Sequence, residues 1–308
     1  MSGHSHAHGP AVGGQDHRRR LAVVLGITTT ILVVEVVGAL VSGSLALLAD
    51  AAHMLTDAAG LLIALIAATL AVRPASAART WGYRRGEVLA ATVQAAVLLA
   101  VAVFVLVEGV RRLLEPPQVA STAMGVFGIV GLAGNLASML ILARAGSSNL
   151  NLRAALLEVA NDALGSVAVL LAAVVIATTG WLRADAVVSM LIALLILPRT
   201  LRLLRETAEV LLEATPRELD LDDVRRHLLE LDHVHAVHDL HASQITTGLP
   251  VLTAHVVIDD SCFIDGHAPR MLDQLQACVA GHFAIAVEHS TFQLEPASHG
   301  EHEAGVHA

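Results

Sequence analysis

Lysine is absent from the 308-residue chain, and charged residues of all kinds make up only 15% of it. A P-loop of the form G-x-x-x-x-G-K-[ST] needs a lysine, so ATP hydrolysis by that route is excluded. Aromatic residues are scarce, at 3%, and cysteine occurs twice, at Cys262 and Cys278. Two cysteines in one polar segment indicate no disulfide framework and fit a reducing compartment.

Hydrophobic residues, in contrast, make up 55% of the chain, and its mean hydropathy is +0.66. The apolar residues gather in runs of about 20, the length that the hydrocarbon core of a bilayer requires of a helix. Six such runs occur, at residues 21–41, 44–72, 88–110, 120–143, 154–178 and 184–204. The sequence therefore predicts an α-helical membrane protein with six transmembrane helices.

The arginines are distributed unevenly between the two sides of these runs. One side has twelve: Arg18, Arg19, Arg20, Arg73, Arg79, Arg84, Arg85, Arg144, Arg153, Arg199, Arg202 and Arg205. The other side has Arg111, Arg112 and Arg183. Because basic residues favour the cytoplasmic side, both ends of the chain are expected in the cytoplasm and the protein in the plasma (inner) membrane. Asp185, near the outer end of the last run, is expected at the interface.

Charge also separates the two parts of the chain. Residues 1–205 hold fifteen arginines against ten acidic residues, whereas residues 206–308 hold four against eighteen. The second part also holds twelve of the seventeen histidines. Such an acidic segment attracts cations and repels nucleic acid, so no nucleic-acid partner is expected.

Four segments follow from these patterns. Residues 1–17 form a His-rich tail expected to be disordered, residues 18–205 the transmembrane domain, residues 206–296 a cytoplasmic domain, and residues 297–308 a second His-containing tail. Within the cytoplasmic domain, residues 217–231 and 268–283 have helical periodicity, and residues 235–245, 250–259 and 289–295 alternate as strands. The order αββαβ predicts a small α+β domain in which both helices cover one face of a three-stranded sheet.

Ionisable residues inside two of the apolar runs are the strongest functional signal. His53 and Asp57 are four residues apart, as are Glu158 and Asp162, so each pair lies on one face of a helix. Asp50 precedes His53 by three residues and is a less certain member of the first group. Three carboxylates and an imidazole suit a divalent cation such as Zn²⁺, and they also take up protons. The alternative is a hydrogen-bonded network that only holds the helices together.

Three stretches, SGSLALLADAAHMLTDAAGL, LEVANDALGSVAVL and EHSTFQLEP, resemble the cation diffusion facilitator family of metal/proton antiporters, and the likeness extends over residues 20–299. The resemblance implies six transmembrane helices, a metallochaperone-like (ferredoxin-like) cytoplasmic domain and a homodimer. In the zinc-exporting branch both intramembrane sites are His-x-x-x-Asp. Glu158 stands in place of the second histidine, and this harder oxygen ligand favours harder ions such as Mn²⁺ or Fe²⁺. Zn²⁺ stays first among the candidate ions, with Co²⁺, Cd²⁺, Fe²⁺ and Mn²⁺ behind it.

A second metal site is expected in the cytoplasmic domain. Adjacent strands can bring His238, His255 and Glu295 together on one sheet face, whereas His241, three residues after His238, is expected on the opposite face. By resemblance, His238, His241, His255, His289 and Glu295 match family positions associated with cytoplasmic metal binding, and His267 is a weaker candidate. The alternative is that several of them are ordinary exposed histidines.

These observations predict a proton-coupled exporter of divalent metal cations, with Zn²⁺ first among the ions, and not an enzyme. Zinc bound by the cytoplasmic domain is expected to regulate transport, and the resemblance implies that this domain also carries the homodimer. A non-transporting membrane metal sensor is the alternative from another functional class. An intramembrane metalloenzyme is disfavoured because no His-Glu-x-x-His motif occurs and no nucleophile or base stands out near the site. A bis-histidine haem site is excluded because His53 is the only histidine in any apolar run.

Overall fold

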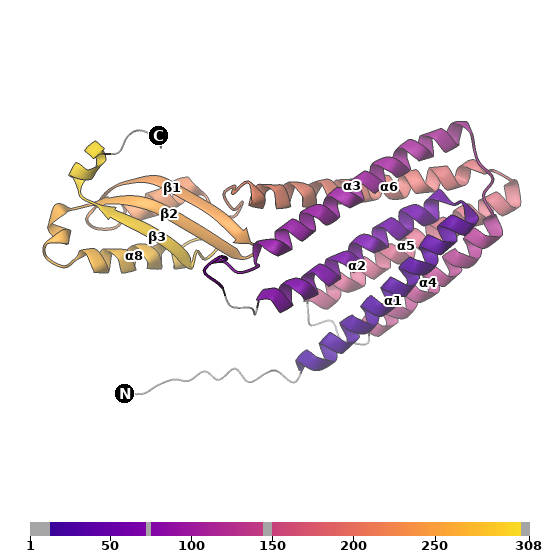
Figure 1. Cartoon of the computed structure of the whole chain (residues 1–308), viewed down its shortest axis with the longest axis horizontal. Coiled ribbons are helices and arrows are strands. Elements are labelled where there is room, and N and C mark those ends of the chain that lie inside the picture. Colours follow the sequence, from indigo (N-terminus) through magenta and orange to yellow (C-terminus); the bar gives the residue numbers. More distant parts are fainter. Residues whose placement is uncertain (1–12, 72–74, 144–149, 303–308) are drawn as a thin grey trace. The chain divides into compact units, whose positions relative to one another are not determined.

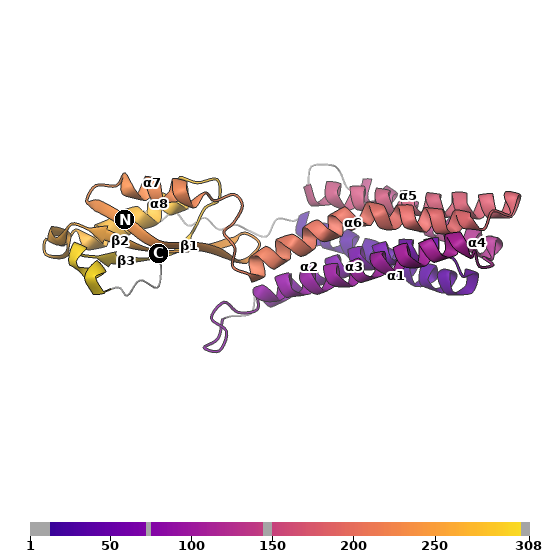
Figure 2. The same cartoon turned by 90° about the horizontal axis from the view of Figure 1, so that it is seen from above.

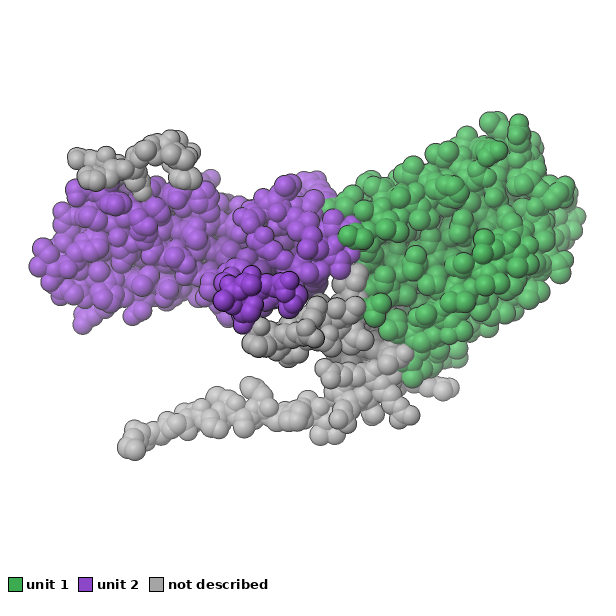
Figure 3. All heavy atoms as spheres, in the orientation of Figure 1, with its two compact units in different colours: residues 1–65, 93–204 green, residues 66–92, 205–308 purple. Residues whose placement is uncertain are grey.

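The structure is a computed structural model that describes residues 13–71, 75–143 and 150–302. The chain divides into two compact units (Figure 3). Unit 1 comprises residues 1–65 and 93–204, and unit 2 comprises residues 66–92 and 205–308. The second unit therefore includes the end of one long helix and the beginning of the next, as well as the C-terminal part of the chain.

All six predicted apolar runs are helical. They form α1 (Gly13–Ser42), α2 (Leu45–Ala71), α3 (Arg85–Leu114), α4 (Ser121–Ala143), α5 (Leu150–Thr179) and α6 (Arg183–Leu211) (Figure 1). Among the described residues, α1, α3, α4, α5 and α6 contain segments long and apolar enough to cross a membrane. Many side chains in the second half of α2 lie outside the described part of the chain, so the same statement about length and hydropathy is not made for α2.

Helices α1 and α6 extend furthest beyond their predicted limits. Helix α1 begins at Gly13, so residues 13–17, predicted as disordered, are helical; residues 1–12 of that predicted tail lie outside the described part. A helix already formed by an apolar run adds further residues easily, because only its nucleation is costly. Helix α6 likewise continues through Pro198 to Leu211, past the predicted boundary at residue 205. Proline removes one backbone donor from this helix but does not end it.

Glycines let the helices of unit 1 approach closely. Helix α4 packs against α5 and α1. A Cβ on Gly128 would touch the Leu170 side chain at 3.0 Å, and Gly134 leaves no room for a Cβ beside Ile31. Gly128, Gly131 and Gly134 follow one another at intervals of three, the small-residue pattern that allows close contact between membrane helices.

Asp185 joins α6 to the start of α2. Its carboxylate accepts hydrogen bonds from the Ser44 hydroxyl at 2.6 Å and from the backbone N–H groups of Leu45 and Ala46 at 2.8 and 3.1 Å. It therefore satisfies backbone donors that the first turn of a helix leaves free. Asp185 is buried between these helix ends rather than open to solvent.

Unit 2 contains a three-stranded sheet in the order β1-β2-β3. Strands β1 (Val234–Thr246) and β2 (Leu249–Ile258) are antiparallel, and β3 (His289–Glu295) runs parallel to β2. Helices α7 (Leu221–Leu229) and α8 (Ala268–Gly281) lie on the same side of the sheet (Figure 2). Val224 and Leu228 of α7 and Leu275 and Val279 of α8 are fully buried in the core against the sheet. The predicted αββαβ order is confirmed.

Two short 3₁₀ helices, η1 (Asp260–Phe263) and η2 (Ala297–His302), follow β2 and β3. Helix α7 is shorter than the predicted 217–231, because Asp220 caps it by accepting hydrogen bonds from the N–H groups of Asp222 and Asp223. Residues 303–308 of the predicted C-terminal tail lie outside the described part.

Candidate metal sites

The structure brings His53 of α2 and Asp162 of α5 together inside unit 1. Their Nε2 and Oδ1 atoms lie 3.6 Å apart, and the Asp162 side chain is only 3% exposed. Asp57 lies four residues after His53 on α2, and its side chain is outside the described part. Imidazole nitrogen and carboxylate oxygen at this separation can move onto one ion with small side-chain shifts, because Zn²⁺ binds such atoms at about 2.0–2.2 Å.

Glu158, one turn before Asp162 on α5, has a partner that the sequence analysis missed. The Arg199 guanidinium of α6 lies 2.6 Å from Glu158 Oε1. The sequence places Arg199 at a membrane boundary, because Pro198 precedes it. Since α6 continues as a helix through that proline, Arg199 reaches the carboxylate instead. Glu158 is thus paired with a positive charge that a histidine at this position would not need.

Two further carboxyl groups lie deep in unit 1. Asp50 is 1% exposed and accepts a hydrogen bond from the Ser166 hydroxyl of α5 at 3.2 Å. Glu35 of α1 is fully buried, and its carboxyl group lies against Gly131 of α4. Neither Glu35 oxygen has a hydrogen-bond partner among the residues that the structure describes. Acidic groups without such a partner are rare in apolar surroundings and usually belong to an ion or proton pathway.

The second group of ligand-type side chains lies on the sheet of unit 2. His255 Nδ1 is 2.8 Å from Glu295 Oε1, and His238 Nε2 is 3.3 Å from Glu295 Oε2. One ligand atom from each of the three residues falls within 4.8 Å of the others. Glu295 is only 2% exposed, while the two histidines are partly open to solvent. The sheet therefore assembles three of the predicted ligands, and a tetrahedral ion there would have one further position to fill.

A β-bulge overturns the expectation that His241 faces away from His238. His238 pairs with His255 and His241 pairs with Thr253, so β1 uses three residues where β2 uses two. Directly paired residues of two strands lie on one face, which puts His241 on the same face as His238. The bulge includes Asp239, whose φ is 48°. Asp239 lies 2.8 Å from His241 Nε2 and 3.6 Å from His255 Nε2, and it is a ligand candidate that the sequence analysis missed.

His289 and His267 have other neighbours. His289 is at the opposite end of β3 from Glu295, and its ring packs edge-to-face on Trp81 with centroids 4.7 Å apart. His267 Nδ1 lies 2.8 Å from Asp265, and its ring is beside that of His233. Neither residue belongs to the group of His238, His255 and Glu295 in this chain.

Long apolar helices that bring imidazole and carboxylate groups together between them are typical of membrane proteins that move cations. Comparisons with known proteins identify the family. The model of the cation efflux transmembrane domain matches residues 21–212, and that of the cation efflux protein cytoplasmic domain matches residues 216–297. The chain belongs to the cation efflux family, also called the cation diffusion facilitator family, which is a family of transporters.

Curated relatives match almost end to end. The chain is 43% identical over 306 residues to the metal cation efflux system protein CzcD of Cupriavidus metallidurans, covering 99% of this chain and 94% of that protein. It is 39% identical over 296 residues to the zinc transporter ZitB of Escherichia coli, covering 95% and 92%. The cadmium, cobalt and zinc/H(+)-K(+) antiporter of Bacillus subtilis is 35% identical over 304 residues, covering 98% and 94%.

Proposed function

We propose that this protein exports divalent metal cations from the cytoplasm in exchange for protons, with Zn²⁺ as the principal substrate. The transported ion binds to His53, Asp57, Glu158 and Asp162. The observation that carries this proposal is the approach of His53 to Asp162 between two apolar helices. Relatives named as zinc, cadmium and cobalt transporters support the choice of ion.

Proton exchange follows from the chemistry of these ligands. A metal ion binds to neutral imidazole and to ionised carboxylates, so it displaces any protons that the same atoms hold. When the site opens to the side with more protons, protonation of the same groups releases the ion and resets the site. Metal and proton therefore occupy the site alternately, which is the requirement for an antiporter.

Glu158 gives this site a different preference among metal ions from that of a site with two histidines. It offers a harder oxygen ligand, which improves binding of Mn²⁺ and Fe²⁺ relative to a nitrogen ligand. Arg199 offsets the additional negative charge, since it lies 2.6 Å from the Glu158 carboxylate. Metal has to compete with this arginine for Glu158, so the resting site is less attractive to a divalent cation than its three carboxylates alone would make it.

The remaining parts serve this transport cycle. Both chain ends and the C-terminal domain of residues 206–296 lie in the cytoplasm, the membrane is the plasma (inner) membrane, and two copies form a homodimer through that domain. Zinc held by His238, His255 and Glu295 stabilises a transport-ready arrangement of the dimer and so regulates activity. His241 and His289 have supporting roles, since the first contacts Asp239 and the second packs on Trp81.

The proposal is tested with purified protein in liposomes that carry an imposed pH gradient. Fluxes of Zn²⁺, Co²⁺, Mn²⁺ and Fe²⁺ are measured for the wild type, Asp57→Ala, Asp162→Asn and Glu158→His. Asn161→Ala is the matched control, because Asn161 precedes Asp162 on α5 and is exposed. We expect gradient-dependent zinc flux in the wild type and Asn161→Ala, its loss in Asp57→Ala and Asp162→Asn, and a changed ion preference in Glu158→His.

Other outcomes would redirect the proposal. Flux of Mn²⁺ or Fe²⁺ in preference to Zn²⁺ would keep the exporter and change its substrate. Flux of none of the four ions, with zinc still bound by unit 2, would favour a membrane metal sensor over a transporter.

A further inference from the structure

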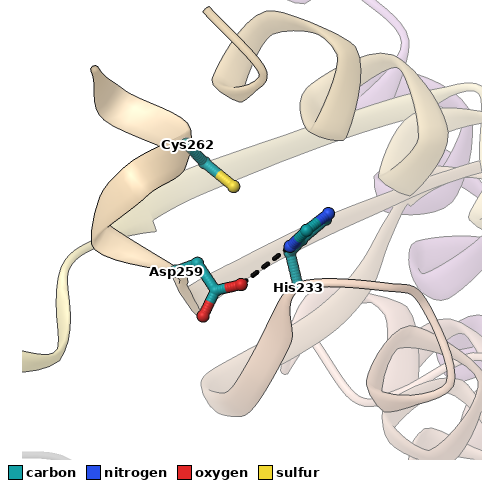
Figure 4. A group of neighbouring side chains, drawn as sticks. All are labelled: His233, Asp259 and Cys262. Carbon is teal, nitrogen blue, oxygen red and sulfur yellow. Dashed lines mark hydrogen bonds and ion pairs between the residues drawn. The ribbon is translucent and has the colours of Figure 1, made fainter. Parts of the chain in front are cut away.

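Another group of three ligand-type side chains, separate from the sheet site described above, lies at one end of the sheet in unit 2. His233 immediately precedes β1, Asp259 immediately follows β2, and Cys262 lies in η1 (Figure 4). His233 Nδ1 is 2.7 Å from Asp259 Oδ2, and one ligand atom of each residue lies within 4.8 Å of the other two. The Cys262 thiol points toward the space beside the imidazole and the carboxylate (Figure 4). This group shares no residue with His238, His255 and Glu295.

Backbone hydrogen bonds hold the three residues in position. The N–H of Asp259 donates to the carbonyl of His233 at 3.1 Å, and the N–H of Cys262 donates to the carbonyl of Asp259 at 2.9 Å. His233 has a φ of 67°, a left-handed conformation that few residues other than glycine adopt. Such a conformation is uncommon enough to suggest a local role, and here it belongs to the residue that supplies the imidazole.

Two further histidines, His235 and His267, lie beside this group of three residues. His235 Nε2 lies 2.5 Å from Asp259 Oδ1, the carboxylate oxygen that does not contact His233. A second contact of this kind orients a carboxylate for metal binding, as outer partners do in known metal sites. The His267 ring lies 5.9 Å from the His233 ring between centroids, which makes His267 a candidate for a fourth ligand.

We propose that His233, Asp259 and Cys262 bind a divalent cation of borderline or soft character, namely Zn²⁺, Co²⁺ or Cd²⁺. Thiolate is the ligand that selects such ions over Mg²⁺, Ca²⁺ or Mn²⁺, and its combination with imidazole and carboxylate is a typical zinc ligand set. A bound ion would link the start of β1 to the 3₁₀ helix after β2. The proposal depends on this geometry alone and holds whether or not the chain transports metal.

The competing interpretation is that Cys262 is simply a core residue. Its side chain is fully buried and contributes to the apolar core of unit 2. On that interpretation, His233 and Asp259 are an exposed hydrogen-bonded pair that happens to lie beside a thiol. The two interpretations differ in whether the sulfur ever binds a metal.

Cobalt absorption of the full-length protein in detergent, under reducing conditions, distinguishes them. Thiolate bound to Co²⁺ gives a charge-transfer band in the near ultraviolet, which nitrogen and oxygen ligands do not give. The chain has only Cys262 and Cys278, and the other two candidate sites contain no cysteine. The band therefore reports this site even when cobalt also fills the others. Cys278→Ala is the matched control, because Cys278 is also buried in unit 2.

We expect the charge-transfer band in the wild type and in Cys278→Ala, and its loss in Cys262→Ala. His233→Ala, which changes an exposed side chain and leaves the thiol in place, should weaken cobalt binding to this site at least tenfold. Retention of the unfolding temperature in each variant excludes misfolding as the cause. No band in cobalt-saturated wild type, or a band that persists in Cys262→Ala, would overturn the proposal.

Discussion

At the scale of single residues, Arg199 offsets the negative charge of the Glu158 carboxylate. The carboxylate stands where the family resemblance implies a histidine, and the arginine lies 2.6 Å from it. A guanidinium stays charged at all relevant pH values, so it offsets the carboxylate without taking or releasing a proton. The sequence change from nitrogen to oxygen ligand is thus accompanied by a compensating charge from another helix.

Removal of this arginine should strengthen metal binding. In Arg199→Gln, a divalent cation no longer competes with a positive charge for Glu158. We expect the KM for zinc transport to fall by about tenfold, corresponding to a Coulomb interaction of about 1.4 kcal/mol at a partly exposed site. Zinc flux into proteoliposomes at varied concentration measures KM. Arg202→Gln, at an exposed position on the same helix, is the control, and a raised KM in Arg199→Gln would show that the arginine mainly supports structure.

Cys278 provides a prediction about pH. Burial first, and the nearby Glu230 carboxylate second, raise the pKa of the Cys278 thiol. Since the thiolate is the reactive form, alkylation at pH 8 should be slower than for an ordinary thiol, about tenfold for each unit by which the pKa is raised. The folded state disfavours the thiolate, so stability should fall as pH rises above the ordinary thiol pKa. Iodoacetamide labelling of Cys262→Ala, folded and unfolded, measures the rate; equal rates in both states would contradict the prediction.

At the scale of elements, helix α5 depends on a glycine for its approach to α2. A Cβ at Gly165 would collide with the Asp50 carboxylate, which also accepts the hydrogen bond from Ser166. The close approach places Asp162, one turn earlier on α5, beside His53. The separation of these two helices therefore sets the distance between candidate ligands.

Gly165→Ala should disturb this arrangement. Overpacking of this kind costs about 1–3 kcal/mol, so we expect a lower unfolding temperature and a large loss of zinc flux. Gly125→Ala is the matched control, because the nearest atom to a Cβ there is 3.9 Å away, an ordinary contact. Thermal unfolding in detergent and flux in proteoliposomes are the measurements. Equal behaviour of the two alanine variants would show that α2 and α5 can separate without consequence.

At the scale of the whole molecule, the two compact units carry separate candidate metal sites. An ion that binds only the folded state at a hundred times its Kd stabilises that state by about 2.7 kcal/mol. Zinc should therefore slow hydrogen exchange in β1, β2 and β3 of the full-length protein. Glu295→Gln should abolish this protection, because it removes the carboxylate that contacts both His238 and His255.

Asp162→Asn serves as the control for that experiment, since it alters only the candidate site of unit 1. It should leave zinc-dependent protection of the strands unchanged. Loss of protection in Asp162→Asn would show that the sites are coupled rather than independent. Hydrogen exchange followed by mass spectrometry resolves the strands from the helices of unit 1.

Much of the architecture could be predicted from the sequence, because the responsible forces act within short segments. A bilayer requires about 20 apolar residues per helix, and strand alternation has a period of two, so six helices and the αββαβ order follow from local patterns. Spacings of four residues place Glu158 and Asp162 on one face of a helix for the same reason. The two cation efflux family models match residues 21–212 and 216–297, which include these same stretches.

The tertiary structure decided what depends on contacts between distant residues. The bulge at Asp239 moved His241 to the face of His238, Arg199 reached Glu158, and Asp185 became the cap of α2. The juxtaposition of His233, Asp259 and Cys262 arises because β1 begins where β2 ends. Sequence by itself determined which elements form, because each segment carries its own hydrophobic period. Only the fold decided which side chains meet, because such meetings depend on how separate elements pack.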